Sequence, residues 1–381
     1  MATQKYGVDV YQLNVGQGDG AIYVQFEIGT RKPLSMVLID GGDGQTTKEK
    51  RTFAPWDVIK RTVEHIRSVD FNQNPDLRFD SIVVTHWDSD HVQGVIQFIL
   101  ADLSTGQRET PKREKCKFLK YDATGKPQTV MYFPYWRSDK RSTETKLKGL
   151  KGAEGRTAVF AKQKVGGREV DIMEWYITMK AGDTPITVKN VNLIRHTPET
   201  MLGVDFFLNN TSPVGKKHKD VTSLEELLKK EDSSVDKDKP GLLCISTDRV
   251  LLGWGGKASL MPMIAGGATT DMNKVSIVTL VVWRKSEEIG YYAAGDMDEQ
   301  LEEEIVKWTQ AGLKKLKVRA VKASHHGAAG SFPQSLIKTW EPDSIIFSQG
   351  DKYFHPGALL HSLEPKTQLI SPCSLGNCLL D

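Results

Sequence analysis

Four short apolar segments of the chain each end, at once or after one glycine, at a side chain that can bind a metal ion. The segments are residues 35–39, 81–85, 289–294 and 318–324, and the side chains that follow them are Asp40, His86, Asp296 and His325. Strands of one sheet place their ends along a common edge, where loops gather functional groups. We therefore expect an α/β fold in which the four ends meet.

Hydrophobic periodicity predicts the other elements. Strands are expected at residues 8–15, 21–27, 35–39, 81–85, 275–283, 289–294, 318–324 and 344–347, helices at 55–68, 298–310, 333–340 and from 92 onward, and a buried element of unspecified type at 241–246. The pattern weakens between residues 101 and 270. Within that region, residues 214–240 are highly charged and poor in apolar residues, so a mobile loop is expected there.

The sequence HWDSDH places His86, Asp88, Asp90 and His91 within six residues. If His86 ends a strand and Asp90 opens a helix, the turn between them can gather all four side chains. Imidazole and carboxylate together suit zinc, manganese or iron, and the run holds no thiolate that would specify zinc. Two ligand sets in one run predict two adjacent divalent metal ions, which can activate a water molecule for hydrolysis.

Seven segments together resemble the metallo-β-lactamase superfamily, in particular the hydrolase domain of ComEC-type competence proteins. They are LNVGQGDG at 13–20, LIDGG at 38–42, THWDSDHVQG at 85–94, NKVSIVTL at 273–280, AAGD at 293–296, SHHGAAGS at 324–331 and DKYFHP at 351–356. The resemblance implies an αββα sandwich of metallo-β-lactamase type with a long insertion. Residues 1–100 would be the first half of that domain and 271–381 the second. Residues 101–270 would be an insertion and connecting segment, partly basic and mobile.

The resemblance also implies ligands for the two ions, with zinc preferred and manganese or iron as alternatives. His86 and Asp88 would serve the first metal, and Asp90 and His91 the second. Asp296 would bridge the two.

Further residues complete or support the implied site. His325 would complete the second metal site, with His326 as the second choice for that ligand and as a candidate catalytic residue. Asp40 and Asp19 would orient the ligands from behind. His355, in the last motif, would face the substrate or a metal.

The chain departs from the superfamily pattern at the first metal. Many members have a histidine where Asp88 stands, and a further histidine before the bridging aspartate. Only His196 and His218 lie in that interval, and neither is in a matching motif. The SHHGS motif reads SHHGA, so Ala328 replaces a hydroxyl.

Hydrolysis by a metal-activated water is the expected reaction, with Asp90 orienting that water or accepting its proton. The resemblance favours a phosphodiester substrate. Residues 106–170 hold 17 Lys and Arg against 7 Asp and Glu, so this segment is a possible nucleic-acid contact, with Tyr132, Phe133, Tyr135 and Trp136 to stack bases or to fill a core. The alternatives are an ester, lactone or thioester of small-molecule metabolism, and a metal-binding scaffold without activity.

Bulk composition points to a cytoplasmic globular protein that does not bind a membrane. Hydrophobic residues make up 39% and the formal net charge is +3. No run of 18 apolar residues and no signal-peptide core is visible, and four scattered cysteines form no disulfide framework. The oligomeric state is left open.

Overall fold

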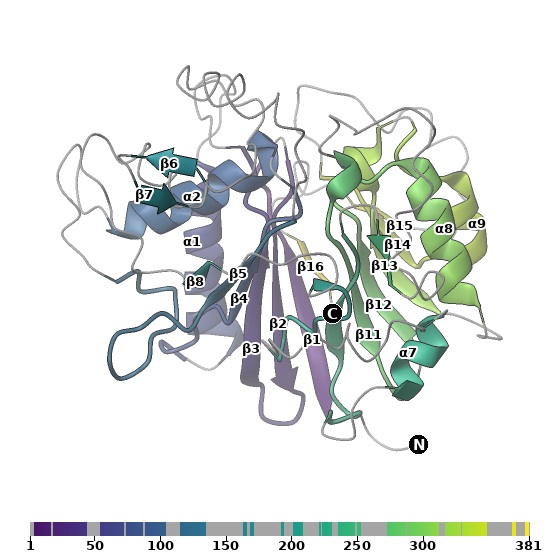
Figure 1. The fold of residues 1–381 in the computed structure, drawn as a ribbon. Helices are drawn as coiled ribbons and strands as arrows, with labels where there is room; N and C mark the ends of the chain where they lie inside the picture. Colours follow the sequence, from purple (N-terminus) through teal and green to yellow (C-terminus); the bar gives the residue numbers. More distant parts are fainter. Residues whose placement is uncertain are drawn as a thin grey trace.

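The computed structural model describes residues 4–16, 18–43, 54–71, 74–86, 88–103, 115–134, 163–165, 168–170, 192–193, 201–208, 221, 223–230, 235–247, 250–252, 273–286, 288–311, 317–328, 330–348, 368–370 and 378–380. Within these ranges the chain forms two seven-stranded sheets that stand side by side. Helices lie on the outer side of each sheet (Figure 1). The expected α/β fold is therefore confirmed.

The first sheet combines antiparallel and parallel pairing. Its strands, in spatial order, are β16 (Cys378–Leu380), β1 (Tyr6–Gln12), β2 (Ala21–Glu27), β3 (Lys32–Ile39), β4 (Ser81–Val83), β5 (Val130–Tyr132) and β8 (Asn192–Leu193). Pairing is antiparallel from β16 to β3 and parallel from β3 to β8. The change of direction falls at β3.

The second sheet repeats this arrangement. Its strands, in spatial order, are β10 (Val250–Leu251), β9 (Gly241–Thr247), β11 (Val278–Trp283), β12 (Glu288–Ala293), β13 (Val318–Lys322), β14 (Ser344–Ile346) and β15 (Gln368–Ile370). Pairing changes from antiparallel to parallel at β12. A separate hairpin joins β6 (Gln163–Val165) and β7 (Arg168–Val170).

Helices connect the first three strands of the parallel part of each sheet. They are α1 (Pro55–His65), which runs on as a π-helical turn (Ile66–Asp70), α2 (Ser89–Leu103), α8 (Glu299–Gln310) and α9 (Gln334–Trp340). The orders β3-α1-β4-α2-β5 and β12-α8-β13-α9-β14 are equivalent. The two halves therefore share a topology, although no sequence repeat is visible.

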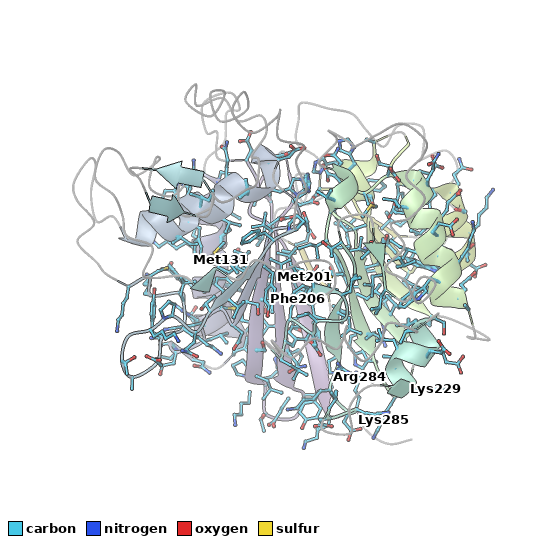
Figure 2. All side chains as sticks on the ribbon, viewed as in Figure 1. Met131, Met201, Phe206, Lys229, Arg284 and Lys285 are labelled. Carbon is cyan, nitrogen blue, oxygen red and sulfur yellow. The ribbon has the colours of Figure 1, made fainter. Side chains whose placement is uncertain are left out.

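Three apolar layers hold the molecule together, because the central strands are buried on both faces. On β2, Val24 packs toward α1 and α2, whereas Tyr23 packs toward the second sheet. The layer between the sheets includes Met201 and Phe206, seen near the middle of Figure 2, and the Phe206 ring meets Tyr132 edge-on at 4.9 Å between centroids. A third layer lies between the second sheet and its helices.

The end of β11 carries a buried ion pair. Arg284, labelled in Figure 2, lies 2.6 Å from Asp205, and its guanidinium also donates to the carbonyl of Lys239 over 2.9 Å. Both charged residues are buried. Ser276 lies before β11 and Arg284 after it. The Arg284–Asp205 ion pair therefore lies at the opposite end of β11 from Ser276.

Several expected elements have different bounds in the structure. The strand expected at 8–15 ends at Gln12, because Leu13 turns to donate to Gly20 over 2.9 Å. The strand expected at 275–283 begins only at Val278, after a short 3-10 turn (Asn273–Val275).

The expectation of a mobile loop at 214–240 is wrong for part of that stretch. A helix, α7 (Leu224–Lys230), forms there with Ser223 accepting from the backbone of Glu226. Leu224, Leu227 and Leu228 recur at helical spacing and are buried against the second sheet. In the described part of the chain, no helix has the length and apolar character needed to cross a membrane.

Candidate metal centre

The four strand ends meet, but they come from two sheets rather than from one common sheet edge. Asp40 follows β3 and His86 lies three residues beyond β4 in the first sheet, whereas Asp296 and His325 follow β12 and β13 in the second. In each sheet these are the two strands where parallel pairing begins. The backbone of Ile277 donates to Thr85 over 2.9 Å and joins the two sheets beside the cluster.

Glycines let the loop after β3 lie against the start of α2. Gly41 donates to the carbonyl of His91 over 2.8 Å, and Gly94 donates to Gly42 over 2.9 Å. A Cβ on Gly94 would lie 1.7 Å from the carbonyl oxygen of Gly41. The glycines of the LIDGG and HVQG segments therefore permit the contact that brings Asp40 beside His91.

Three imidazoles are fixed through their Nδ1 atoms. Nδ1 of His91 lies 2.8 Å from Asp40 Oδ2. Nδ1 of His86 lies 3.2 Å from the Thr85 hydroxyl and 3.3 Å from that of Ser276.

The third imidazole belongs to His326. Its Nδ1 is 3.3 Å from the Ser348 hydroxyl and 3.4 Å from Asp19 Oδ1. Because every Nδ1 is engaged, the Nε2 atom of each ring is the one presented to the interior of the cluster.

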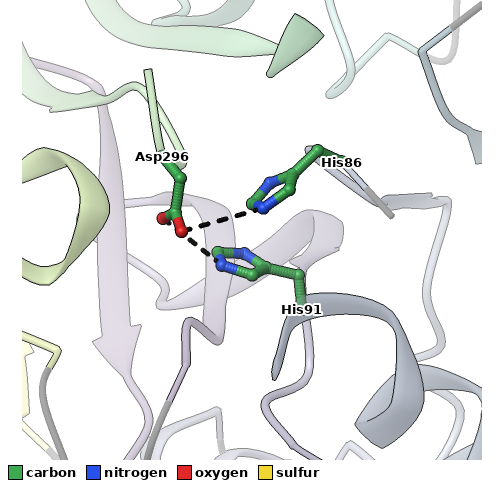
Figure 3. A group of neighbouring side chains, drawn as sticks. All are labelled: His86, His91 and Asp296. Atoms are coloured by element: carbon green, nitrogen blue, oxygen red, sulfur yellow. Dashed lines mark ion pairs between the residues drawn. The ribbon is translucent and has the colours of Figure 1, made fainter. Parts of the chain in front are cut away.

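The three Nε2 atoms converge on Asp296. Figure 3 shows His86 and His91 against this carboxylate, at 3.7 and 3.3 Å from its oxygens, and Nε2 of His326 lies 3.6 Å from it. All three Nε2 atoms and Asp296 Oδ1 are buried without a hydrogen-bond partner. Buried polar atoms are normally paired, so these four require another explanation.

A divalent cation fits these donors. Ligands bound to zinc at about 2.0–2.1 Å in a tetrahedron lie about 3.4 Å apart, which matches the separations around Asp296. Two groups of donor atoms lie within 4.8 Å of one another and share an imidazole: His86, His91 and Asp296, and Asp90, His91 and His326. Nitrogen and carboxylate oxygen are suitable donors for zinc, manganese or iron.

The two neighbouring histidines differ in position. His326 is buried, and its Nε2 lies 3.4 Å from Asp90. His325 is 35% exposed, and its Nε2 lies 3.9 Å from Asp296. His326 therefore lies deeper in the cluster than His325 and closer to Asp296.

Asp88 stands at the margin of the cluster. Its Oδ2 lies 3.6 Å from Nε2 of His86, and its side chain is 36% exposed. Asp90 is 21% exposed. Among the four candidate ligands of the HWDSDH run, solvent thus reaches these two carboxylates, while His86 and His91 are buried.

Several supporting groups were not anticipated from the sequence. The Thr85 hydroxyl donates to Asp40 over 2.5 Å, and the Ser276 hydroxyl accepts from the backbone of Asp296 over 3.2 Å. Lys322 is buried and pairs with Asp19, to which Ser348 also donates. In the sequence, one feature indicates that Lys322 is buried, namely its position within the apolar segment VRAVKAS.

Left-handed backbone conformations are concentrated in this cluster. Asp40, His325 and His326 have φ values of 56°, 45° and 57°. Such conformations cost energy for residues other than glycine and gather at functional sites. The surrounding hydrogen bonds therefore hold these turns in place.

Electrostatic interactions favour the protonated forms of His91 and His326 and the ionised form of Asp90. Burial opposes charge on His91 and His326, yet Asp296 and its neighbours raise the pKa of His91 well above 6.5 and that of His326 to about 10. Burial likewise opposes ionisation of Asp90, but its close neighbours His326 and His91 lower its pKa to about 2. Without a bound cation, protons on the imidazoles compensate the carboxylates, and a divalent ion would replace them.

Some sequence predictions cannot be placed or take another role. His355, Tyr135 and Trp136 lie outside the described residues, as do His196 and His218. Tyr132 and Phe133 are buried in the core. These two aromatic rings are therefore not available to stack nucleic-acid bases.

Comparison with known proteins gives structural likeness without a sequence match. The sequence matches no protein-family model and no curated protein. One similar solved structure is described as the crystal structure of a new diphosphatase from the PhnP family, with a TM-score of 0.37 and 9% identity over 98% of this chain and 97% of that one. With so little shared sequence and so loose a superposition, the site of this chain stands on its own geometry.

Proposed function

We propose that the chain is a metal-dependent hydrolase of metallo-β-lactamase type, an αββα sandwich with a long insertion, whose centre binds two divalent ions. The observation that carries this proposal is the set of buried Nε2 atoms of His86, His91 and His326, which face Asp296 without hydrogen-bond partners. Zinc is the preferred metal, with manganese or iron as alternatives.

Charge supports two ions rather than one. Among the described residues of the centre, the carboxylates are those of Asp19, Asp40, Asp88, Asp90 and Asp296, and the ammonium is that of Lys322. Five negative charges and one positive charge leave four, which two divalent cations neutralise once the imidazoles are neutral ligands. Uncompensated charge inside a protein is costly, so this match favours a centre with two metals.

The residues divide the chemical work. His86, His91, His326, Asp90 and Asp296 would hold the ions. When bound, the metals lower the pKa of a water molecule and neutralise negative charge on the attacked group.

Asp90 has the position to act on that water. Its carboxylate is partly exposed, and its pKa of about 2 keeps it ionised at neutral pH. It can therefore accept a hydrogen bond from the attacking water and orient it. His325, also partly exposed, faces the same margin, and burial lowers its pKa, so at neutral pH it is an uncharged side chain there.

A phosphodiester is the substrate class that we propose. Paired divalent ions stabilise both the attacking and the leaving oxygen of a phosphoryl displacement, and the motif resemblance points the same way. An ester, lactone or thioester is the second candidate, because the same centre can attack a carbonyl carbon.

Turnover of two generic substrates tests this proposal. Metal-loaded protein should hydrolyse bis-p-nitrophenyl phosphate, lose that activity after chelation and recover it on addition of zinc or manganese. Asp90→Ala and Asp296→Ala should be inactive but folded, whereas Asp76→Ala, at a side chain that is 84% exposed, should match the wild type. Turnover of p-nitrophenyl acetate alone would favour the second candidate, and bound metal without either activity would indicate a scaffold.

A further inference from the structure

Lys322 is a buried cation beside a centre that is proposed to bind cations. It is the last residue of β13 and only 3% of its surface is exposed. Its ammonium pairs with Oδ2 of Asp19 and donates to the carbonyl of Gly295 over 3.1 Å. A lysine is rarely buried without a partner, and here the partner is one carboxylate.

Asp19 has two possible places in this centre. Its Oδ1 accepts from Ser348 and lies 3.4 Å from Nδ1 of His326, which supports that ring from behind. Asp19 also has a carboxylate oxygen within 4.8 Å of donor atoms of Asp296 and His326, a grouping that could itself hold a metal. Something must therefore decide between the supporting position and the ligand position.

We infer that Lys322 is the positioning residue that keeps Asp19 behind His326 and away from the metal ions. The ammonium occupies Oδ2, while Ser348 and Nδ1 of His326 share Oδ1, so both carboxylate oxygens are already engaged. This inference rests on the proposed metal centre.

The contact with Gly295 gives Lys322 a second effect. Gly295 directly precedes Asp296, and its carbonyl also accepts from the backbone of His325 over 3.0 Å. One ammonium thus connects the loop of Asp19 with the loop of Asp296. Removing it leaves a carboxylate in excess and frees Asp19 to move toward the ions.

Four proteins test the inference: the wild type, Lys322→Met, Asp19→Asn and the double variant. Methionine keeps the length of the lysine without its charge, and asparagine keeps the shape of the aspartate. The double variant removes a buried ion pair as a unit, which proteins tolerate better than removal of one partner. Each full-length protein is unfolded in urea without metal, and each is titrated with Co²⁺ while its visible absorption is recorded.

Lys322→Met should unfold at lower urea than the wild type, because Asp19 is left as a buried carboxylate without its cation. Its Co²⁺ spectrum should become weaker, because an added carboxylate ligand raises the coordination number. The double variant should recover the wild-type spectrum and much of the lost urea midpoint. If Lys322→Met fails to fold and the double variant folds with the wild-type spectrum, that outcome also supports the inference.

Two results would overturn the inference. One is a Lys322→Met spectrum identical to that of the wild type, and the other is a double variant no better than Lys322→Met in both measurements. If the wild-type protein binds no Co²⁺, the proposed metal centre itself fails and the inference fails with it. Failure of the metal centre is distinguishable from failure of the inference, because it is seen in the wild-type protein alone.

Discussion

Asp40 lies behind His91 at the candidate metal centre, with 2.8 Å between its Oδ2 and the Nδ1 of His91. An ionised carboxylate only accepts, so Nδ1 carries a hydrogen, and in the neutral ring the lone pair of Nε2 is directed toward Asp296. Thr85 donates to both oxygens of Asp40, from its backbone at 2.8 Å and its hydroxyl at 2.5 Å. The ligand orientation therefore depends on a carboxylate from a different strand.

Replacing Asp40 by asparagine should weaken metal binding without removing a ligand. The amide can still take the place of the carboxylate, but it holds the required tautomer of His91 less firmly. Loss of such a partner costs about 10–100-fold in metal affinity or activity. Competition with a chelating dye measures the affinity, and an affinity equal to that of the wild type would show that Asp40 does not orient His91.

His326→Gln and His325→Gln should separate the two neighbouring histidines. We expect His326→Gln to reduce turnover by about a thousandfold, the equivalent of several kcal/mol of charge stabilisation. His325→Gln should retain metal and have a smaller effect, because its side chain is at the margin. Measuring metal content and turnover of both variants decides the point, and greater metal loss in His325→Gln would reverse the assignment.

Glu302 predicts how stability depends on pH. It is fully buried on α8, where its Oε1 accepts from Tyr292 over 2.8 Å and from Ser324 over 2.6 Å. Burial raises its pKa from 4.5 to about 8. The protonated acid is therefore favoured by folding, and its stabilising contribution is complete below pH 4.5 and lost as pH rises to about 8.

The size of this effect follows from the shift, on the order of 5 kcal/mol between the two pH limits. Glu302→Gln keeps the acceptor for Tyr292 and Ser324 but cannot ionise. In urea unfolding, the variant should match the wild type near pH 5 and exceed its stability at pH 9. Parallel stability curves for the two proteins would mean that Glu302 is ionised at neutral pH.

Gly94 and Gly29 form a matched pair of alanine substitutions. Alanine at 94 favours the helix by about 1 kcal/mol, yet its Cβ would overlap the carbonyl of Gly41. We expect a net loss of about 1–3 kcal/mol or more in stability, together with weaker metal binding because Asp40 is displaced from His91. Gly29 has open space around the position of a Cβ, so Gly29→Ala should behave as the wild type in thermal unfolding.

Sequence patterns predicted the strands well because most are buried on both faces and stand out as apolar runs. They also predicted that Asp40, His86 and Asp296 would meet. The distribution of these strand ends over two sheets was not predicted, because the periodicity of a strand does not indicate which sheet the strand joins. The choice between His325 and His326 depends on two consecutive left-handed residues, which no propensity predicts.

The supporting groups were harder still to predict. Lys322 reads as an ordinary charged residue until its burial is known, and Ser348 reaches Asp19 across 329 positions of sequence. α7 was missed because its charged residues outweigh its leucines in composition, although the spacing of those leucines is helical. Such contacts are set by tertiary packing.

The number of metal ions bound per chain tests the central claim most directly. Purified protein is stripped with chelator, dialysed against zinc or manganese and analysed for metal, beside Asp296→Ala and Asp76→Ala treated in the same way. A centre that stabilises attacking and leaving groups with paired ions predicts about two ions per chain in the wild type and in Asp76→Ala, and a marked loss in Asp296→Ala. A wild-type chain that retains no metal, or an Asp296→Ala variant that retains as much as the wild type, would contradict it.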